Sequence, residues 1–139
     1  MNGNKFLVVL LICLAAFAPA FVKAQGVPQQ VNYQAVLRNS SGNIMPNRSI
    51  IVRLGIKNTL LQTLWEEDHF VTTNQFGLFT LLLGTGATTG AGTFPTFAAI
   101  DWASGYRSLD VKVDLGNGFT SYGNLQLISV PYAFVSDTT

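Results

Sequence analysis

Cysteine and histidine are almost absent from this chain, and each occurs once, as Cys13 and His69. A single cysteine cannot form an internal disulfide, so the fold has to be held by its core and not by a covalent bridge. A single histidine leaves little material for a metal centre, because catalytic zinc usually takes three protein ligands and no second ligand pair has a fitting spacing. The sequence therefore predicts neither a metal nor a cofactor.

Charge is also scarce, with Asp, Glu, Lys and Arg making up 11% of the residues. Beyond residue 24 there are six basic side chains, since Lys5 and Lys23 precede that point, and they are scattered among seven acidic ones, for a net charge of −1. Nucleic acids and anionic membrane surfaces are bound by clustered basic residues. Neither is expected as a partner.

The N-terminal segment, residues 1–24, has the layout of a secretory signal peptide. A basic start is followed by an apolar or small block over residues 6–22, and Val22-Lys23-Ala24 precedes a polar, strand-patterned chain. We predict cleavage after Ala24, with Ala20 as the second choice, and a mature start at Gln25. The protein is then expected to be exported, to the cell surface, the extracellular space or the periplasm.

Two other interpretations of this segment remain open. The block of residues 6–22 is at the lower edge of the roughly 17–25 residues that a membrane-spanning helix needs, and Pro19 would interrupt such a helix. Cys13 could indicate a lipid anchor, but it lies in the middle of the apolar block and lacks a small residue beside it. No membrane association is predicted after cleavage.

Hydrophobic residues alternate with polar ones in the remainder of the chain, and no stretch of it shows a convincing helical stripe. This period of two indicates half-buried strands, and Asn-, Ser- and Gly-rich turns separate them. We predict an all-β fold, an antiparallel β-sandwich over residues 25–135 with a disordered tail at 136–139. About seven strands are expected, at Val31–Arg38, Ile50–Lys57, Leu60–Thr73, Leu78–Leu83, Tyr106–Leu115, Phe119–Tyr122 and Asn124–Val130.

The glycine-rich stretch Gly84–Gly92 superficially resembles a phosphate-binding loop. It lacks the lysine of such a loop and no helix follows it. We interpret it as a mobile loop at the edge of the sandwich.

The densest polar cluster spans four consecutive residues of one predicted strand, Glu66–His69. Glu67 and His69 are expected to share a face with Trp65, whereas Glu66 and Asp68 point the other way. A carboxylate beside a histidine could serve acid–base catalysis or metal binding. We favour a solvated or structural strand segment and predict no catalytic residue.

Aromatic residues near strand ends and loops are the other candidates for function. Trp65, Trp102, Tyr106 and Tyr122, with Phe119 beside them, could stack on sugars or on peptide side chains. Alternatively, Trp65 and Trp102 close the two ends of the core. The partner, if there is one, would be a cell-surface glycan or a protein, and the oligomeric state stays open.

Four short motifs resemble one family, at Val31–Arg38, Thr72–Phe79, Ile100–Trp102 and Leu127–Ala133. Together they are similar to the N-terminal β-sandwich module of large secreted or cell-surface proteins of Bacteroidota and related bacteria, over residues 27–135. The resemblance implies a module at the base of a stalk, a tail-fibre-like region or adhesin-like repeats, and it brings no catalytic residue. Such proteins generally continue far beyond this module, so this chain is expected to be a short stand-alone form or a truncated product.

These patterns favour a secreted, cofactor-free structural or binding module without catalytic activity. The main alternative is an accessory domain that binds carbohydrate through its loop aromatics. A third hypothesis is an enzyme that uses Glu67 and His69.

Overall fold

The computed structural model describes residues 30–127. Within that range the chain forms seven strands and one short 3-10 turn, η1 (Phe97–Ala99). The strands are β1 (Val31–Val36), β2 (Ser49–Lys57), β3 (Thr63–Thr72), β4 (Leu78–Leu83), β5 (Ala87–Thr88), β6 (Arg107–Asp114) and β7 (Phe119–Leu127). The predicted all-β class is confirmed. The expected signal peptide (1–24), the closing motif after residue 127 and the tail (136–139) lie outside the described residues.

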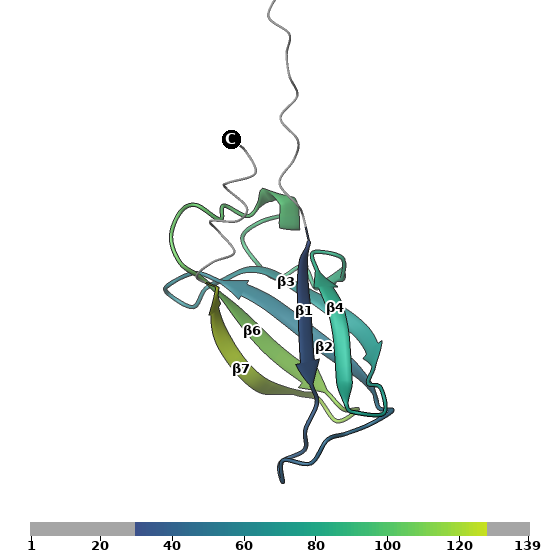
Figure 1. Cartoon of the computed structure of the whole chain (residues 1–139). Coiled ribbons are helices and arrows are strands. Elements are labelled where there is room, and N and C mark those ends of the chain that lie inside the picture. The colour runs from purple at the N-terminus through teal and green to yellow at the C-terminus, as the bar shows by residue number, and fades with distance from the viewer. Residues whose placement is uncertain (1–29, 128–139) are drawn as a thin grey trace, which may run out of the picture.

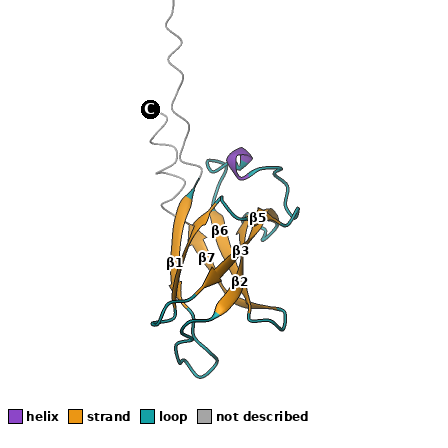
Figure 2. Cartoon of the chain, turned by 90° about the vertical axis from the view of Figure 1, so that its right-hand side faces the viewer, coloured by secondary structure: helices purple, strands orange, loops and turns teal. Residues whose placement is uncertain are grey.

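The strands form two antiparallel sheets (Figures 1 and 2). A small sheet pairs β1 with β4, and a five-stranded sheet has the order β5-β3-β2-β6-β7. β2 therefore lies at the centre of the large sheet, hydrogen-bonded to β3 on one side and to β6 on the other. In Figure 1 the small sheet lies in front of the large one, so that the two sheets form two layers.

The core lies between these layers and is built from alternate residues of the strands. Leu54 is fully buried and lies opposite Val111 of β6, which is 6% exposed. Arg53 and Lys112, the adjacent register pair, point to the other face and are partly exposed. The predicted strand register is thereby confirmed. The buried hydrophobic residues are Leu37, Ile50, Val52, Leu54, Ile56, Leu64, Trp65, Phe79, Leu81, Leu83, Phe97, Ile100, Leu109, Val111 and Val113.

Four loops are stabilised by the same pattern of hydrogen bonds. In each of them, one side-chain oxygen accepts hydrogen bonds from two backbone N–H groups that follow it in the chain. The acceptors are Asn39, Asn58, Asn74 and Asp114. Asn and Asp favour turns because their short side chains can make this bond. The loops at Asn39, Asn74 and Asp114 coincide with predicted turns, and Asp114 closes the hairpin between β6 and β7.

Three strand predictions were wrong in detail. β3 starts at Thr63 and not at Leu60, because Asn58 organises a tight turn in which Leu61 adopts a φ of 60°. The loop predicted at Gly84–Gly92 contains β5, which pairs with Glu67 and Asp68 of β3. The two strands expected at 119–122 and 124–130 form one strand, β7, which continues past an irregularity in its pairing with β6. Its described part ends at Leu127.

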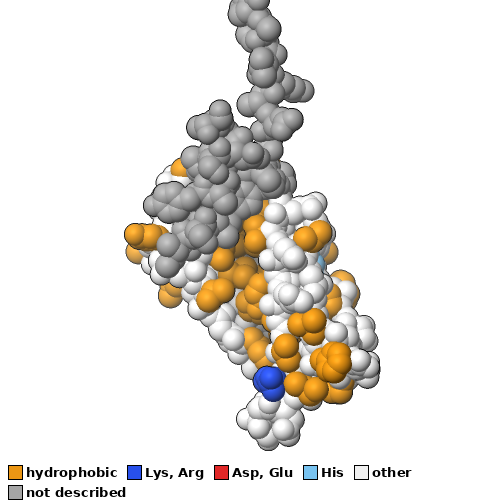
Figure 3. Space-filling model, viewed as in Figure 1, with side chains coloured by type: hydrophobic (Ala, Val, Ile, Leu, Met, Phe, Trp, Pro, Cys, Tyr) orange, Lys and Arg blue, Asp and Glu red, His pale blue; other side chains and the backbone are white. Residues whose placement is uncertain are grey.

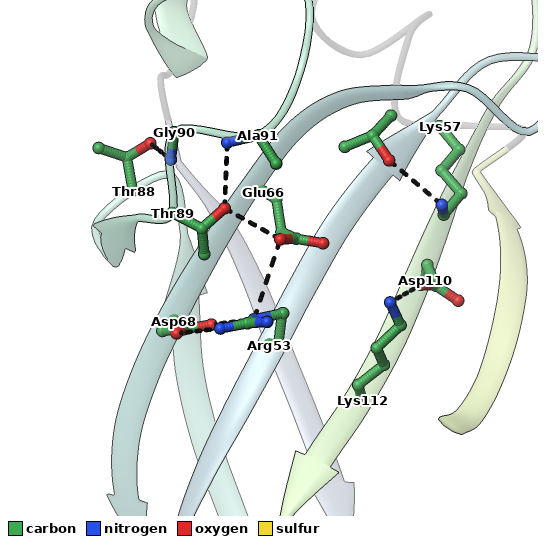
Figure 4. Close-up of polar contacts among 11 residues, drawn as sticks. Arg53, Lys57, Glu66, Asp68, Thr88, Thr89, Gly90, Ala91, Asp110 and Lys112 are labelled. Atoms are coloured by element: carbon green, nitrogen blue, oxygen red, sulfur yellow. Dashed lines mark hydrogen bonds and ion pairs between the residues drawn. The ribbon is translucent and has the colours of Figure 1, made fainter. Parts of the chain in front are cut away.

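The two outer faces of the molecule differ in charge. In Figure 3, the uncovered part of the face on the side of the small sheet shows scattered hydrophobic side chains among uncharged surface, and a basic patch at its lower end. The described ion pairs of Arg53 and Lys112 lie instead on the outward face of the large sheet (Figure 4). The polar candidates for function therefore gather on the five-stranded sheet.

Candidate functional site

The inward half of the polar cluster on β3 is closed to solvent. Trp65 and His69 are 7% and 9% exposed, and Glu67 between them is fully buried. The indole Nε1 of Trp65 donates to Oε2 of Glu67 at 2.8 Å, and Nε2 of His69 lies 2.6 Å from Oε1. The backbone N–H of Gly84, just after β4, donates to the same Oε1 at 2.8 Å. Glu67 thus connects the large sheet to the end of a strand in the small one.

These contacts set the ionisation of Glu67. Burial by itself raises the pKa of a carboxyl group, but the hydrogen bonds from His69, Trp65 and Gly84 outweigh it and hold the pKa of Glu67 below its ordinary value. A buried carboxylate with three internal donors is stable as the anion and turns its oxygens to those donors. This arrangement suits a structural role better than acid–base exchange with a substrate.

Gly86 closes the cluster from outside. A Cβ atom at this position would lie 2.6 Å from Nε2 of His69 and 2.8 Å from the carbonyl oxygen of Asp68. Only a residue without a side chain allows the backbone to come this close. The glycine-rich stretch therefore packs directly against His69.

The outward half of the cluster forms an ion-pair network around Arg53 (Figure 4). The guanidinium makes two hydrogen bonds to Asp68, from Nε to Oδ1 at 2.7 Å and from Nη2 to Oδ2 at 2.8 Å. Glu66 lies 3.9 Å from the same Nε and accepts a hydrogen bond from Thr89 at 2.9 Å. The hydrogen bond to Asp68 raises the pKa of Arg53, and its guanidinium also lies 4.0 Å from the ring centroid of Phe119.

A second ion pair lies beside this network on β6. Nζ of Lys112 is 3.7 Å from Oδ2 of Asp110, as expected from their alternation on one strand face. Asp114, on the same face, caps the β6–β7 turn instead. Arg53 and Lys112 thus each have an acidic neighbour on this face.

Of the four candidate aromatics, Trp65 and Trp102 lie near each other, because both pack against Phe97, so they do not close two opposite ends of the core as the alternative expected. Trp65 was predicted as a ligand contact, but it is 7% exposed and packs against Phe97 with ring centroids 6.3 Å apart. Trp102 is half-buried and also packs against Phe97, with ring centroids 5.7 Å apart. Trp65 is therefore part of the core and offers no face to a ligand.

The two tyrosines are exposed and occupy different places. Tyr122 is 44% exposed on β7, and its hydroxyl donates to the carbonyl oxygen of Arg38 at 3.3 Å, which ties β7 to the residues after β1. Tyr106 is 60% exposed at the start of β6 and lines a cavity of about 260 Å³. Tyr106 therefore combines exposure with a concave surface.

Sequence reasoning missed two features of the surface. Phe70 is 75% exposed on β3 and lines a second shallow cavity, of about 330 Å³, together with Ile51 and Asp114. The exposure of Phe70 could have been predicted from the sequence. Glu66, Asp68 and Phe70 are every second residue along the strand, so the side chain of Phe70 points to the same outward face as theirs. Tyr106 also shares its cavity with Asn58 and Gln126, which are distant from it in the sequence on either side, and no local pattern could reveal these neighbours.

The described residues offer no assembled metal centre and no spanning helix. Among residues 30–127 there is no group of three His, Cys, Asp or Glu side chains that could hold a metal ion. In the same range no helix is long and apolar enough to cross a membrane.

The chain matches a known protein family. No curated protein and no solved structure matches the chain. A family model described as a domain of unknown function (DUF8740) matches residues 32–126, which include almost all of the two sheets. The chain therefore belongs to the DUF8740 family.

Proposed function

We propose that this protein is a non-catalytic structural and binding module that is exported to the cell exterior. It is a β-sandwich and forms the base of a larger surface or fibre-like protein. Its resemblance to such modules and the signal-peptide layout of residues 1–24 support the proposal.

The proposal that the protein is non-catalytic rests on the burial and the hydrogen bonds of Glu67. The one carboxylate–histidine pair that could perform acid–base chemistry is buried, with its oxygens engaged by Trp65, His69 and Gly84. A general acid or base has to come within hydrogen-bond reach of its substrate. The pair instead links the two sheets, and such a link supports a structural role.

Expression of the full precursor with a C-terminal tag tests this function. We expect the tagged protein in the periplasm, at the cell surface or in the medium, and we expect purified protein to unfold cooperatively with the same midpoint with and without EDTA. Retention in the cytosol with an intact Met1 would contradict the export, and a midpoint that falls on chelation would contradict the metal-free fold.

A second candidate function is that of a carbohydrate-binding accessory domain. The position of Tyr106 favours it, because this exposed ring borders a cavity lined with amide and hydroxyl side chains. Aromatic rings with a few converging polar groups are typical of small-ligand sites.

A further inference from the structure

The cavity beside Tyr106 lies at one end of the outward face of the large sheet. It forms where the turn after β2 meets the start of β6 and the end of β7, and its lining includes Thr59, Tyr106, Ser108, Asn124 and Gln126. Among residues 30–127, no aspartate or glutamate lines it. Its volume of about 260 Å³ is slightly below the roughly 300–1,000 Å³ of sites for drug-sized ligands. A single ring-sized unit fits such a space.

Two anchors hold the walls of this cavity in place. Asn58 fixes the turn, since its Oδ1 accepts from the backbone of Leu60 and Gln62 and its Nδ2 donates to the Gln62 side chain at 2.8 Å. Arg107, which is 6% exposed, donates from Nη1 to the carbonyl oxygen of Tyr106 at 3.1 Å and from Nη2 to that of Asp101 at 2.5 Å. These bonds tie the loop that carries Tyr106 to the sheet. A ligand would therefore meet a largely preformed surface.

The lining side chains that remain available to hydrogen-bond a ligand are uncharged, and they include both donors and acceptors. Ser108 and Gln126 are cross-strand partners, and the Asn124 amide donates to the Ser108 hydroxyl at 3.2 Å, which leaves the Asn124 carbonyl as an acceptor. The Gln126 amide has no side-chain hydrogen bond to any residue in the range 30–127. An amide that can donate and accept matches a sugar hydroxyl, which does the same.

We propose that this cavity binds one unit of a neutral saccharide. The Tyr106 ring packs against the C–H face of the sugar, and Gln126 and Asn124 hydrogen-bond its hydroxyls. A neutral sugar is favoured because the exposed side chains of the lining within residues 30–127 are uncharged. Arg107, the charged lining residue in that range, is 6% exposed; its Nη1 and Nη2 each donate to a carbonyl oxygen, and its Nε is buried without a hydrogen-bond partner. This inference rests on the second candidate function and names its site and ligand class.

Isothermal titration of the purified exported protein tests the proposal. The probes are maltohexaose, cellohexaose and the hexamer of N-acetylglucosamine, with an oligogalacturonate as the acidic comparison. At least one neutral hexasaccharide should bind, and Tyr106→Ala should weaken that binding about tenfold or more, since a stacked aromatic and its buried area contribute on the order of 1.4 kcal/mol. Gln126→Ala should weaken it roughly threefold to tenfold.

Phe70→Ala is the matched control, because Phe70 is an exposed aromatic of the same sheet that lines a different cavity. Binding should be unchanged in this variant and retained in Tyr106→Phe, which keeps the ring. Thermal unfolding of each variant identifies any loss of fold, and if Tyr106→Ala does not fold, Gln126→Ala and Tyr106→Phe still carry the test.

Three results would overturn the proposal. They are no binding of any neutral hexasaccharide, binding of the acidic oligomer alone, and an equal loss in Phe70→Ala and Tyr106→Ala. Each of them leaves the proposed export and metal-free stability untouched, because those are measured by fractionation and unfolding. Conversely, a cytosolic location would contradict the proposed function while sugar binding by the purified protein could still be measured.

Discussion

The imidazole Nε2 of His69 lies 2.6 Å from Oε1 of Glu67, and the two side chains are 9% and 0% exposed. They alternate with Asp68 on β3 and both face inward, so the pleat of one strand is enough to bring them together. The Gly84 N–H on the same oxygen then joins this pair to the small sheet. The pair is therefore a buried polar link between the two layers.

Removal of the Glu67 carboxylate should destabilise the fold. Glu67→Leu leaves the donors of Trp65, His69 and Gly84 without their acceptor. Each buried donor left unsatisfied typically costs about 1–3 kcal/mol, so we expect a loss of about 3 kcal/mol or more. Glu67→Gln keeps one acceptor oxygen, and we expect about 1–3 kcal/mol. Urea unfolding at pH 7 measures both, and a Glu67→Leu protein as stable as the wild type would contradict the structural role.

The same carboxylate predicts a pH dependence. Because the pKa of Glu67 in the folded protein is below its ordinary value, its contribution to stability is fully present above the unfolded-state pKa and is lost as the pH falls through the folded-state pKa. The difference in unfolding free energy between wild type and Glu67→Gln should therefore shrink between about pH 5 and pH 2. Urea titrations at several pH values check this, and a difference that grows towards low pH would have the wrong sign.

Truncation of a side chain on the core face of β2 should destabilise the fold far more than truncation of a side chain on its outer face. Leu54→Ala removes a fully buried side chain opposite Val111 and should cost about 2–5 kcal/mol. Arg53→Ala removes a partly exposed ion pair with Asp68 and should cost at most about 1 kcal/mol. Thermal or urea unfolding compares the two, and equal effects would place the strand one residue out of register.

Gly86→Ala should disturb the buried pair directly. The added methyl group would lie 2.6 Å from His69 Nε2, so the imidazole or the backbone has to move. We expect a loss of about 1–3 kcal/mol and a shifted His69 imidazole resonance in the NMR spectrum. Gly42→Ala is the control, because a Cβ there meets no atom within 4 Å and only its φ of +83° is unfavourable. An unchanged His69 resonance in Gly86→Ala would mean that Gly86 does not close the cluster.

The predicted cleavage site lies outside the described residues and can be tested by mass. Signal peptidases require small residues before the cut, so Ala24→Asp should block processing, whereas Ala20→Asp should leave a product that starts at Gln25. Mass spectrometry of the exported protein distinguishes these results. Processing that is lost in Ala20→Asp and kept in Ala24→Asp would place the site after Ala20.

The closing motif, also outside the described residues, should belong to the domain. Pro131 cannot donate a ladder hydrogen bond, and Tyr132 and Phe134 share a face in an extended chain, which predicts an edge segment that covers the end of the core. Deletion of residues 131–139 should lower the melting temperature markedly, and deletion of 136–139 should not. An unchanged melting temperature after the longer deletion would make the segment a linker.

The alternation of side chains made most strands predictable. A strand buries every second residue, so Leu54 and Val111 could be assigned to the core and Arg53 and Lys112 to the surface before any pairing was known. The turns formed by Asn and Asp were predictable for a similar reason, because the residues that form each turn are close together in the sequence. The prediction failed at Leu60, because residues 60–62 belong to the turn that Asn58 organises and not to the strand that follows it.

The sites depend instead on which strands become neighbours. Periodicity placed Glu67 and His69 on one face, but it could not show that this face is the buried one. It also could not show that the backbone N–H of Gly84, just after β4 of the small sheet, would donate a hydrogen bond to Glu67. Tyr106 is likewise an ordinary exposed aromatic in the sequence. It borders a cavity because β7 pairs with β6 and brings Asn124 and Gln126 beside it. Local patterns are set by the geometry of one strand, whereas a site needs residues from several strands, and their pairing follows from the packing of the whole core.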